Sequence, residues 1–82
     1  MEPYKTLRFG PGEIPDGLLR EHNLRAGVRG VLRVLSGTLV FVMGEERRSL
    51  AEGDTFNIAP EVVHHLEEAG GASIEIQFFR SR

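Results

Sequence analysis

Three histidines are the side chains of this sequence best suited to bind a metal ion or to transfer a proton: His22, His64 and His65. Imidazole is the commonest metal ligand in proteins, and it titrates near neutral pH. The sequence has no cysteine, which excludes a thiolate nucleophile, a thiolate metal site and a disulfide. No serine, histidine and aspartate have a spacing that indicates a catalytic triad. We therefore assign no catalytic residue, and the sequence favours a binding protein over an enzyme.

His64 and His65 begin a short apolar segment that reads as a β-strand. Side chains alternate between the two faces of a strand, so His64 shares a face with Leu66, whereas His65 shares one with Glu67. This pattern predicts that His64 points into the core and that His65 points to solvent. An inward imidazole can be a metal ligand, a general base, or a core histidine hydrogen-bonded to a backbone carbonyl.

His22 lies in the segment 18–24, whose pattern fits either a strand or a helical turn. If this segment and the strand of His64 face each other across one core, the two imidazoles share a pocket. Two histidines hold a divalent ion only when a third ligand and water complete the coordination shell. The residues alone therefore leave two interpretations open for His22: a metal site shared with His64, or a surface histidine beside Glu21.

Three further side chains are possible ligand contacts at that site: Asn23, Glu75 and Gln77. Asn23 follows His22 directly, where an amide either holds a ligand or orients the imidazole; an ordinary turn asparagine is the alternative. Glu75 and Gln77 share one face of the last predicted strand. They supply a third metal ligand if that face turns inward, and they are solvent-facing residues if it does not.

Ten glycines and four prolines divide the chain into short segments. Short strands separated by turn signals at regular intervals are typical of a sandwich or barrel, and no segment of ten or more residues has helical periodicity. The sequence therefore predicts an all-β fold. The expected strands are 7–9, 28–35, 38–43, 47–50, 55–58, 64–68 and 72–80.

The clearest local feature is a tight hairpin predicted at Ser36-Gly37, where glycine supplies the positive φ that such a turn needs. It would join strand 28–35 directly to strand 38–43. Alternation along these strands also predicts the core. The expected core residues are Leu32, Val34, Leu39, Phe41, Leu50, Phe56, Ile58, Leu66, Ile74, Ile76 and Phe78.

Length and charge exclude several classes of protein. The 82 residues suffice for one domain, residues 1–82, with a modest core, so we expect a homodimer to add stability. A net charge of −2 provides no basic surface for nucleic acid. No apolar run approaches the roughly 20 residues that span a bilayer, and the N-terminus lacks the pattern of a signal peptide. These observations predict a cytoplasmic protein without nucleic-acid or membrane partners.

The turn and strand that lead into His64 resemble the second motif of the cupins, which are small antiparallel barrels of the jelly-roll type. Counted from Gly53, the motif histidine falls on His64, with Pro60 one place late and Glu61 where the motif has a second glycine. The first cupin motif closes with a glycine, here Gly37. Its metal-binding glutamate then falls on Gly30, and its pair of histidines is missing.

A narrower resemblance covers almost the whole chain. The order and spacing of the motifs are similar to those of the small cupin found alone in YeaR-type proteins and fused to a methyltransferase in some tellurite-resistance TehB proteins. The segments that carry this resemblance are Tyr4-Lys5, Ile14-Pro15-Asp16-Gly17-Leu18-Leu19, Glu21-His22-Asn23 with Ala26-Gly27, Gly30 to Leu39, Pro60 to Glu67 and Glu75 to Phe79.

The resemblance implies a single small cupin domain that binds a ligand in a pocket around His22 and His64. The expected ligand is one divalent metal ion (zinc, iron, manganese or nickel), a small molecule, or an oxyanion such as tellurite. Two alternatives remain open at this point. One is a metal-dependent cupin enzyme; the other is a degenerate cupin that acts as a dimerisation or regulatory module.

Overall fold

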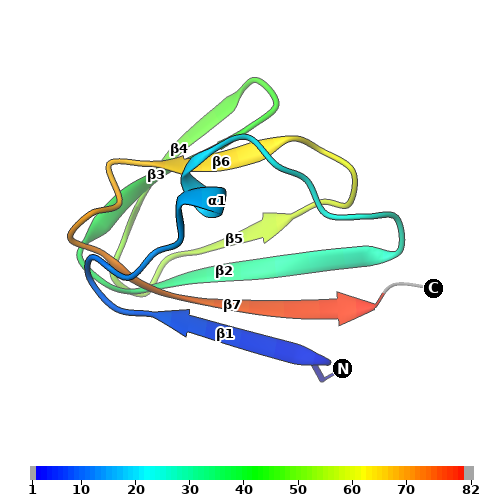
Figure 1. The fold of residues 1–82 in the computed structure, drawn as a ribbon, viewed down its shortest axis with the longest axis horizontal. Helices are drawn as coiled ribbons and strands as arrows, with labels where there is room; N and C mark the ends of the chain where they lie inside the picture. Colours follow the sequence, from blue (N-terminus) through cyan, green and yellow to red (C-terminus); the bar gives the residue numbers. More distant parts are fainter. Residues whose placement is uncertain (1, 81–82) are drawn as a thin grey trace.

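The computed structural model describes residues 2–80, which form seven strands and one short helix (Figure 1). The expected all-β fold is confirmed. No helix among the described residues is long and apolar enough to cross a membrane. The elements are β1 (Lys5–Phe9), α1 (Asp16–Leu19), β2 (Val28–Ser36), β3 (Thr38–Met43), β4 (Glu46–Ala51), β5 (Thr55–Ile58), β6 (His64–Glu67) and β7 (Ser73–Arg80).

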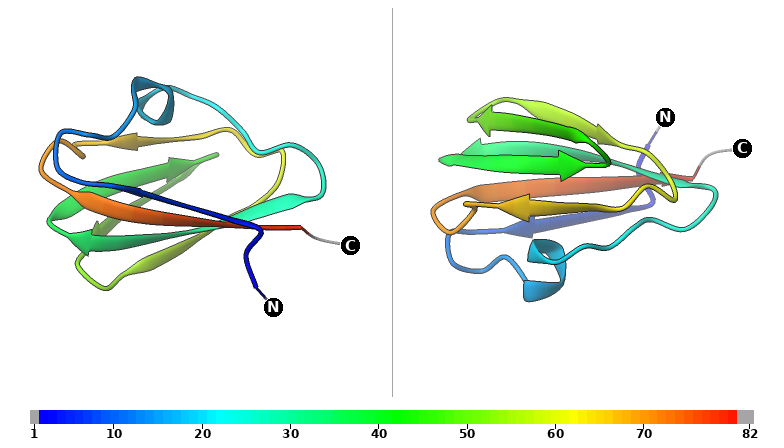
Figure 2. Two further views of the ribbon diagram at one scale, coloured as in Figure 1. Left: turned by 60° about the horizontal axis from the view of Figure 1, so that its bottom comes forward. Right: turned by 90° about the horizontal axis from the view of Figure 1, so that it is seen from above.

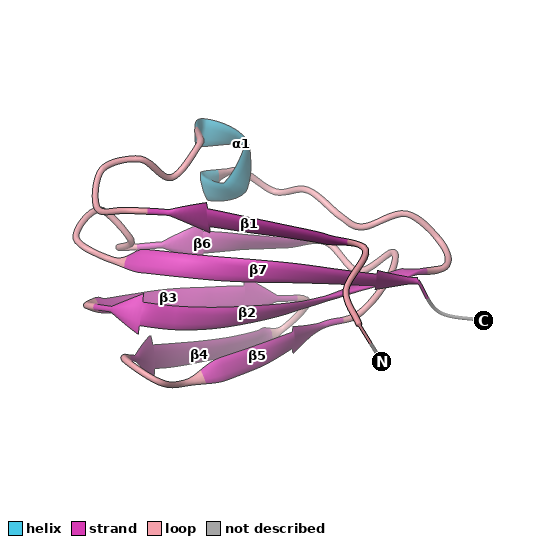
Figure 3. Ribbon diagram, turned by 90° about the horizontal axis from the view of Figure 1, so that it is seen from below, coloured by secondary structure: helices cyan, strands magenta, loops and turns pink. Residues whose placement is uncertain are grey.

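The strands form two antiparallel sheets that pack face to face, as Figures 2 and 3 show from different sides. One sheet has the order β1-β7-β2-β5, and the other has the order β4-β3-β6. Both ends of the described chain lie at the same end of this barrel (Figure 1). The connection from α1 to β2 runs along the edge beside β6. This connection carries His22 and Asn23, so it decides where the expected site lies.

The predicted tight hairpin at Ser36-Gly37 is wrong, because β2 and β3 belong to different sheets. Ser36 pairs with Ser73 of β7, whereas Thr38 pairs with Ala51 of β4. The positive φ expected at Gly37 is present, at 76°. It turns the chain across the end of the barrel instead of back along the same sheet. A Cβ atom on Gly37 would lie only 2.7 Å from the carbonyl oxygen of Gly71.

The core lies between the two sheets and agrees with the prediction except at the end of β7. The other ten predicted core residues are all buried, with Val34 and Ile74 at 0% exposure. Phe78 is half-buried, and Phe79 on the opposite face is 8% exposed. Phe79 is covered by Arg29, whose guanidinium carbon lies 4.6 Å from the centre of the phenyl ring. A cation over an aromatic face is attractive, so this contact explains a buried phenylalanine on an outer face.

Candidate functional site

His22 and His64 lie side by side, joined by an isolated antiparallel bridge. The amide of His22 donates to the carbonyl of His64 at 3.0 Å, and the amide of His64 donates to the carbonyl of His22 at 2.8 Å. Their ring centroids are 4.2 Å apart, with 66° between the planes. The structure brings the two imidazoles together along one sheet edge, and not across the core as the condition for a shared pocket assumed. His22 instead extends the sheet at the edge of β6.

His64 is the only buried polar side chain among the described residues, with 3% exposure. Its neighbour Phe41 on β3 explains this burial, because the two rings stack at a centroid distance of 5.6 Å and an angle of 14°. Burial is also the main reason that the pKa of His64 lies below its usual value, since it disfavours the charged ring. The site therefore favours a neutral imidazole, which is the form that binds metals.

His65 points away from the core, as the alternation predicts. Its Nε2 atom lies 2.8 Å from an oxygen of Glu67, and Arg47 donates to the other oxygen of Glu67 at 2.7 Å. The bond from Arg47, followed by the bond from His65, lowers the pKa of Glu67 to about 2. His65 thus contacts Glu67 on the outer face and takes no part in the inner histidine pair.

Both inner histidines are held in the same way by the backbone. His22 Nδ1 lies 2.9 Å from the carbonyl oxygen of Arg20, and His64 Nδ1 lies 2.9 Å from that of Val62. A carbonyl oxygen only accepts hydrogen bonds, so a ring in its neutral form must carry its proton on Nδ1 in either contact. Each Nε2 atom then presents a lone pair. Metal-binding histidines almost always have this arrangement, with the second ring nitrogen donating to a carbonyl or carboxylate.

The structure does not bring Glu75 and Gln77 to the histidine pair. Ile74 and Ile76 face the core, so Glu75 and Gln77 point to the outer face of the other sheet. There Glu75 accepts a hydrogen bond of 2.7 Å from Arg8 Nε. Within the part of the chain that the structure describes, no group of three histidine, cysteine or acidic side chains is placed to hold a metal.

The four-ligand metal set of the cupin motifs does not fit this chain. A Cβ atom on Gly30, where the motif glutamate would stand, would lie 3.4 Å from Ile58 and 3.5 Å from Leu24. The glutamate's place is thus lined by two aliphatic side chains and by the backbone carbonyl oxygen of Gln77, at 3.6 Å. Glu61 stands where the second motif has a glycine, and its φ of 62° is in the region that glycine favours. Its amide donates to the carbonyl of Leu24 at 2.7 Å, which ties the connection after His22 to the loop before β6.

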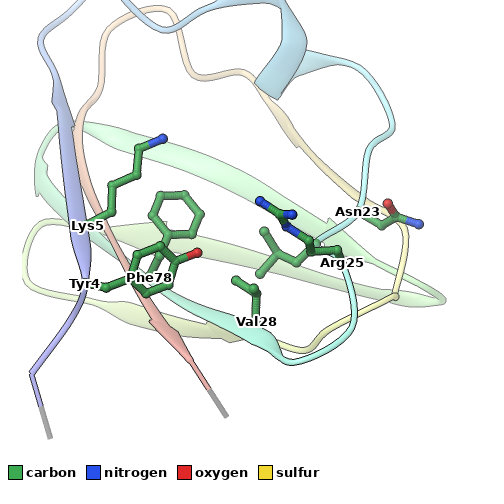
Figure 4. Close-up of a pocket in the computed structure, with 7 residues that line it drawn as sticks. Tyr4, Lys5, Asn23, Arg25, Val28 and Phe78 are labelled. Carbon is green, nitrogen blue, oxygen red and sulfur yellow. The ribbon is translucent and has the colours of Figure 1, made fainter.

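Asn23 is exposed and lines a hollow of about 320 Å³ at the end of the barrel, together with Tyr4, Lys5, Arg25 and other residues. Neither histidine is among the residues that line it. Figure 4 shows the Arg25 guanidinium directed over the hollow, whereas the Asn23 amide points away from it. The sequence does not indicate Tyr4, Lys5 and Arg25 as ligand contacts. Single cations in a loop or at a strand end have no periodicity that would mark them.

The chain matches the TehB-like domain family over residues 5–77. Comparison with curated proteins gives no match. Among solved structures, TehB from Haemophilus influenzae superposes with a TM-score of 0.83 and 22% identity, over 96% of this chain and 31% of that one. A protein from E. coli strain K12 superposes with a TM-score of 0.83 and 16% identity, over 98% and 90%.

A cupin protein from Bacteroides fragilis superposes with a TM-score of 0.67 and 18% identity, over 92% of this chain and 62% of that one. At these identities the superpositions show the fold alone, and they confirm the expected cupin barrel. The chain spans less than a third of the length of the Haemophilus TehB, so the activity of that whole protein is not transferred to this domain.

Proposed function

Because the chain belongs to the TehB-like domain family, as its motifs predict, we propose that it is a small-ligand-binding cupin whose site is the pair His22 and His64. In this proposal a divalent metal ion binds to the two Nε2 atoms, and the remaining coordination positions are open to water or to a small molecule or oxyanion. The observation that carries the proposal is the pair of Nδ1–carbonyl contacts, each 2.9 Å long.

The donor set favours particular metals. Imidazole nitrogen suits zinc, nickel and iron, whereas manganese prefers oxygen ligands. Two imidazoles sharing one zinc ion, with Zn–N bonds of about 2.1 Å and tetrahedral angles, have ring centroids about 5 Å apart. The observed distance of 4.2 Å therefore requires a small outward movement. His22 is the ring able to move, because it is only half-buried.

The histidine pair offers two protein ligands, so we propose that the site binds a ligand and does not catalyse a reaction. A catalytic cupin needs an open metal site with an acid or base beside it, and no third titratable metal-ligand side chain stands at this pair within residues 2–80. Further ligands then come from solvent, from the bound anion (tellurite is one candidate), or from a second copy of the chain in a homodimer.

The proposal is tested by titrating the protein with zinc, nickel and manganese in a calorimeter, followed by elemental analysis of dialysed samples. We expect one zinc or nickel ion per chain and at least tenfold weaker binding by the His22→Gln variant. His22 is half-buried, so this variant should keep the fold, which circular dichroism checks. Elemental analysis of the protein as purified shows whether a metal is already bound.

The matched control is His65→Gln, which removes the neighbouring histidine on the opposite face of β6. We expect this variant to bind zinc like the original protein, because His65 contacts Glu67 and not the inner pair. Equal zinc affinity in the original protein and both variants would contradict the proposal. No binding of any of the three metals would also contradict it and would leave the histidine pair a structural contact.

A further inference from the structure

Residues of β1, β2 and β7 line the hollow at the end of the barrel. The amide of Tyr4 donates to the carbonyl of Phe78 at 2.9 Å, which fixes the chain just before β1 against the end of β7. Lys5 pairs with Phe78 in the sheet register, so both side chains stand on the same face. Val28, at the start of β2, adds a further apolar surface (Figure 4).

Positive charge gathers around this hollow although the whole chain carries a net charge of −2. The Lys5 amine lies 5.7 Å from the centre of the Phe78 ring, and Arg25 lines the opposite side of the hollow (Figure 4). A second hollow, of about 340 Å³, shares Tyr4 and Arg25 with the first and adds Arg80. The guanidinium carbon of Arg80 lies 4.3 Å from the centre of the Tyr4 ring.

These cations are not neutralised by the described part of the chain. The ion pairs found among residues 2–80 involve Arg8, Arg47, Arg48 and His65, and none of them involves Lys5, Arg25 or Arg80. The residues that line the first hollow include no carboxylate. Two unneutralised cations facing an aromatic ring attract an anion, and an arginine fork matches the geometry of a carboxylate.

We propose that this hollow binds a small organic carboxylate, whose charged group pairs with Arg25 and Lys5 and whose flat apolar part packs on Phe78 and Val28. The volume of about 320 Å³ lies at the lower end of the range for small-molecule pockets. An inorganic oxyanion would leave most of this space and the apolar surface unused. The site is separate from the histidine pair, and its ligand requires no metal.

The experiment follows the backbone amide signals of the protein by NMR during titration with benzoate, benzamide and sulfate at constant ionic strength. Benzamide has the shape of benzoate without its charge, and sulfate has charge without an apolar part. We expect benzoate to shift the amides of Lys5, Arg25 and Phe78 at lower concentrations than either of the other two compounds.

Arg25→Gln should weaken benzoate binding at least tenfold. This side chain is exposed, so its loss should not unfold the protein. The matched control is Arg33→Gln, which removes the same charge from an exposed position on β2. His22→Gln should bind benzoate normally, so failure of the metal proposal and failure of this one are distinguishable.

Two results would overturn the inference. One is sulfate binding as tightly as benzoate, which would mean an unspecific anion site. The other is equal benzoate affinity in Arg25→Gln and Arg33→Gln, which would remove Arg25 from the site.

Discussion

Replacing Gly37 with alanine tests the turn that carries the chain from one sheet to the other. The new methyl group would lie 2.7 Å from the carbonyl oxygen of Gly71 and 3.1 Å from the Cα of Ala72, whereas ordinary contacts begin at 3.4 Å. Both neighbours are backbone atoms, so they cannot rotate away as a flexible side chain would. The φ of 76° adds the cost of a left-handed conformation, about 1–2 kcal/mol for a residue with a Cβ.

Gly44→Ala is the matched control for this substitution. Gly44 has a φ of 61°, but a Cβ atom there would meet nothing within 4 Å. Both variants have a similar left-handed cost, and both lower the entropy of the unfolded chain by a similar amount. The difference between them therefore isolates the steric contact. Forcing a methyl group into a closely packed site costs about 1–3 kcal/mol, and we expect Gly37→Ala to be less stable than Gly44→Ala by that amount.

The assay is urea unfolding followed by circular dichroism, at one protein concentration because association would change the apparent stability. For a chain of this size, each kcal/mol also lowers the melting temperature by about 4–8 °C. Equal free energies of unfolding for the two variants, within about 0.5 kcal/mol, would refute the close approach of the β2–β3 turn to residues 71–72.

Four further experiments use urea unfolding. Burial lowers the pKa of His64, so the unfolded chain takes up a proton more readily than the folded chain, and the free energy of unfolding should fall as the pH drops below about 6.5. His64→Gln should make the free energy of unfolding less dependent on pH in this range. An unchanged pH dependence in the variant would contradict the prediction. The pKa of Glu67 lies at about 2 instead of 4.5, so its stabilising effect should be present above pH 4.5 and fade between pH 4.5 and 2; Glu67→Gln should lack this dependence. Glu61→Gly should stabilise the fold by about 0.5–1 kcal/mol, because it relieves a positive φ; a loss of stability would mean that the glutamate side chain is needed. Ile74→Ala should lower the free energy of unfolding by about 2–5 kcal/mol, because Ile74 is fully buried. Leu35 is exposed, so Leu35→Ala should change the free energy of unfolding by less than about 0.5 kcal/mol. Similar losses of stability in the two variants would contradict the assignment of the core.

The strands and most of the core are predictable from the sequence because the residues that determine them are close together along the chain. Alternation along 28–34 predicts which face is buried, and the turn glycines mark where each strand stops. The pairing of β2 with β7 is not local, because it joins Ser36 to Ser73. Gly37 determines the conformation of the turn, but it does not determine which sheet the next strand joins.

The same distinction applies to the candidate site. The inward direction of His64 follows from its own strand, whereas the position of His22 depends on a bridge to a residue far along the chain. The short helix α1 and the irregular segment after it give His22 no periodicity. Likewise, the charged hollow forms only when Lys5 and Arg25, which are distant in sequence, meet beside Phe78.

Imidazole nitrogen NMR tests the central claim most directly, because it observes the four ring nitrogens of His22 and His64 without mutation. At slightly alkaline pH, with zinc absent, we expect both rings to carry their proton on Nδ1, as the bonds to the carbonyls of Arg20 and Val62 require. Addition of one equivalent of zinc should then shift both Nε2 signals and leave the Nδ1 protons in place. Protons on Nε2 in the metal-free protein, or Nε2 signals that do not respond to zinc, would contradict the account.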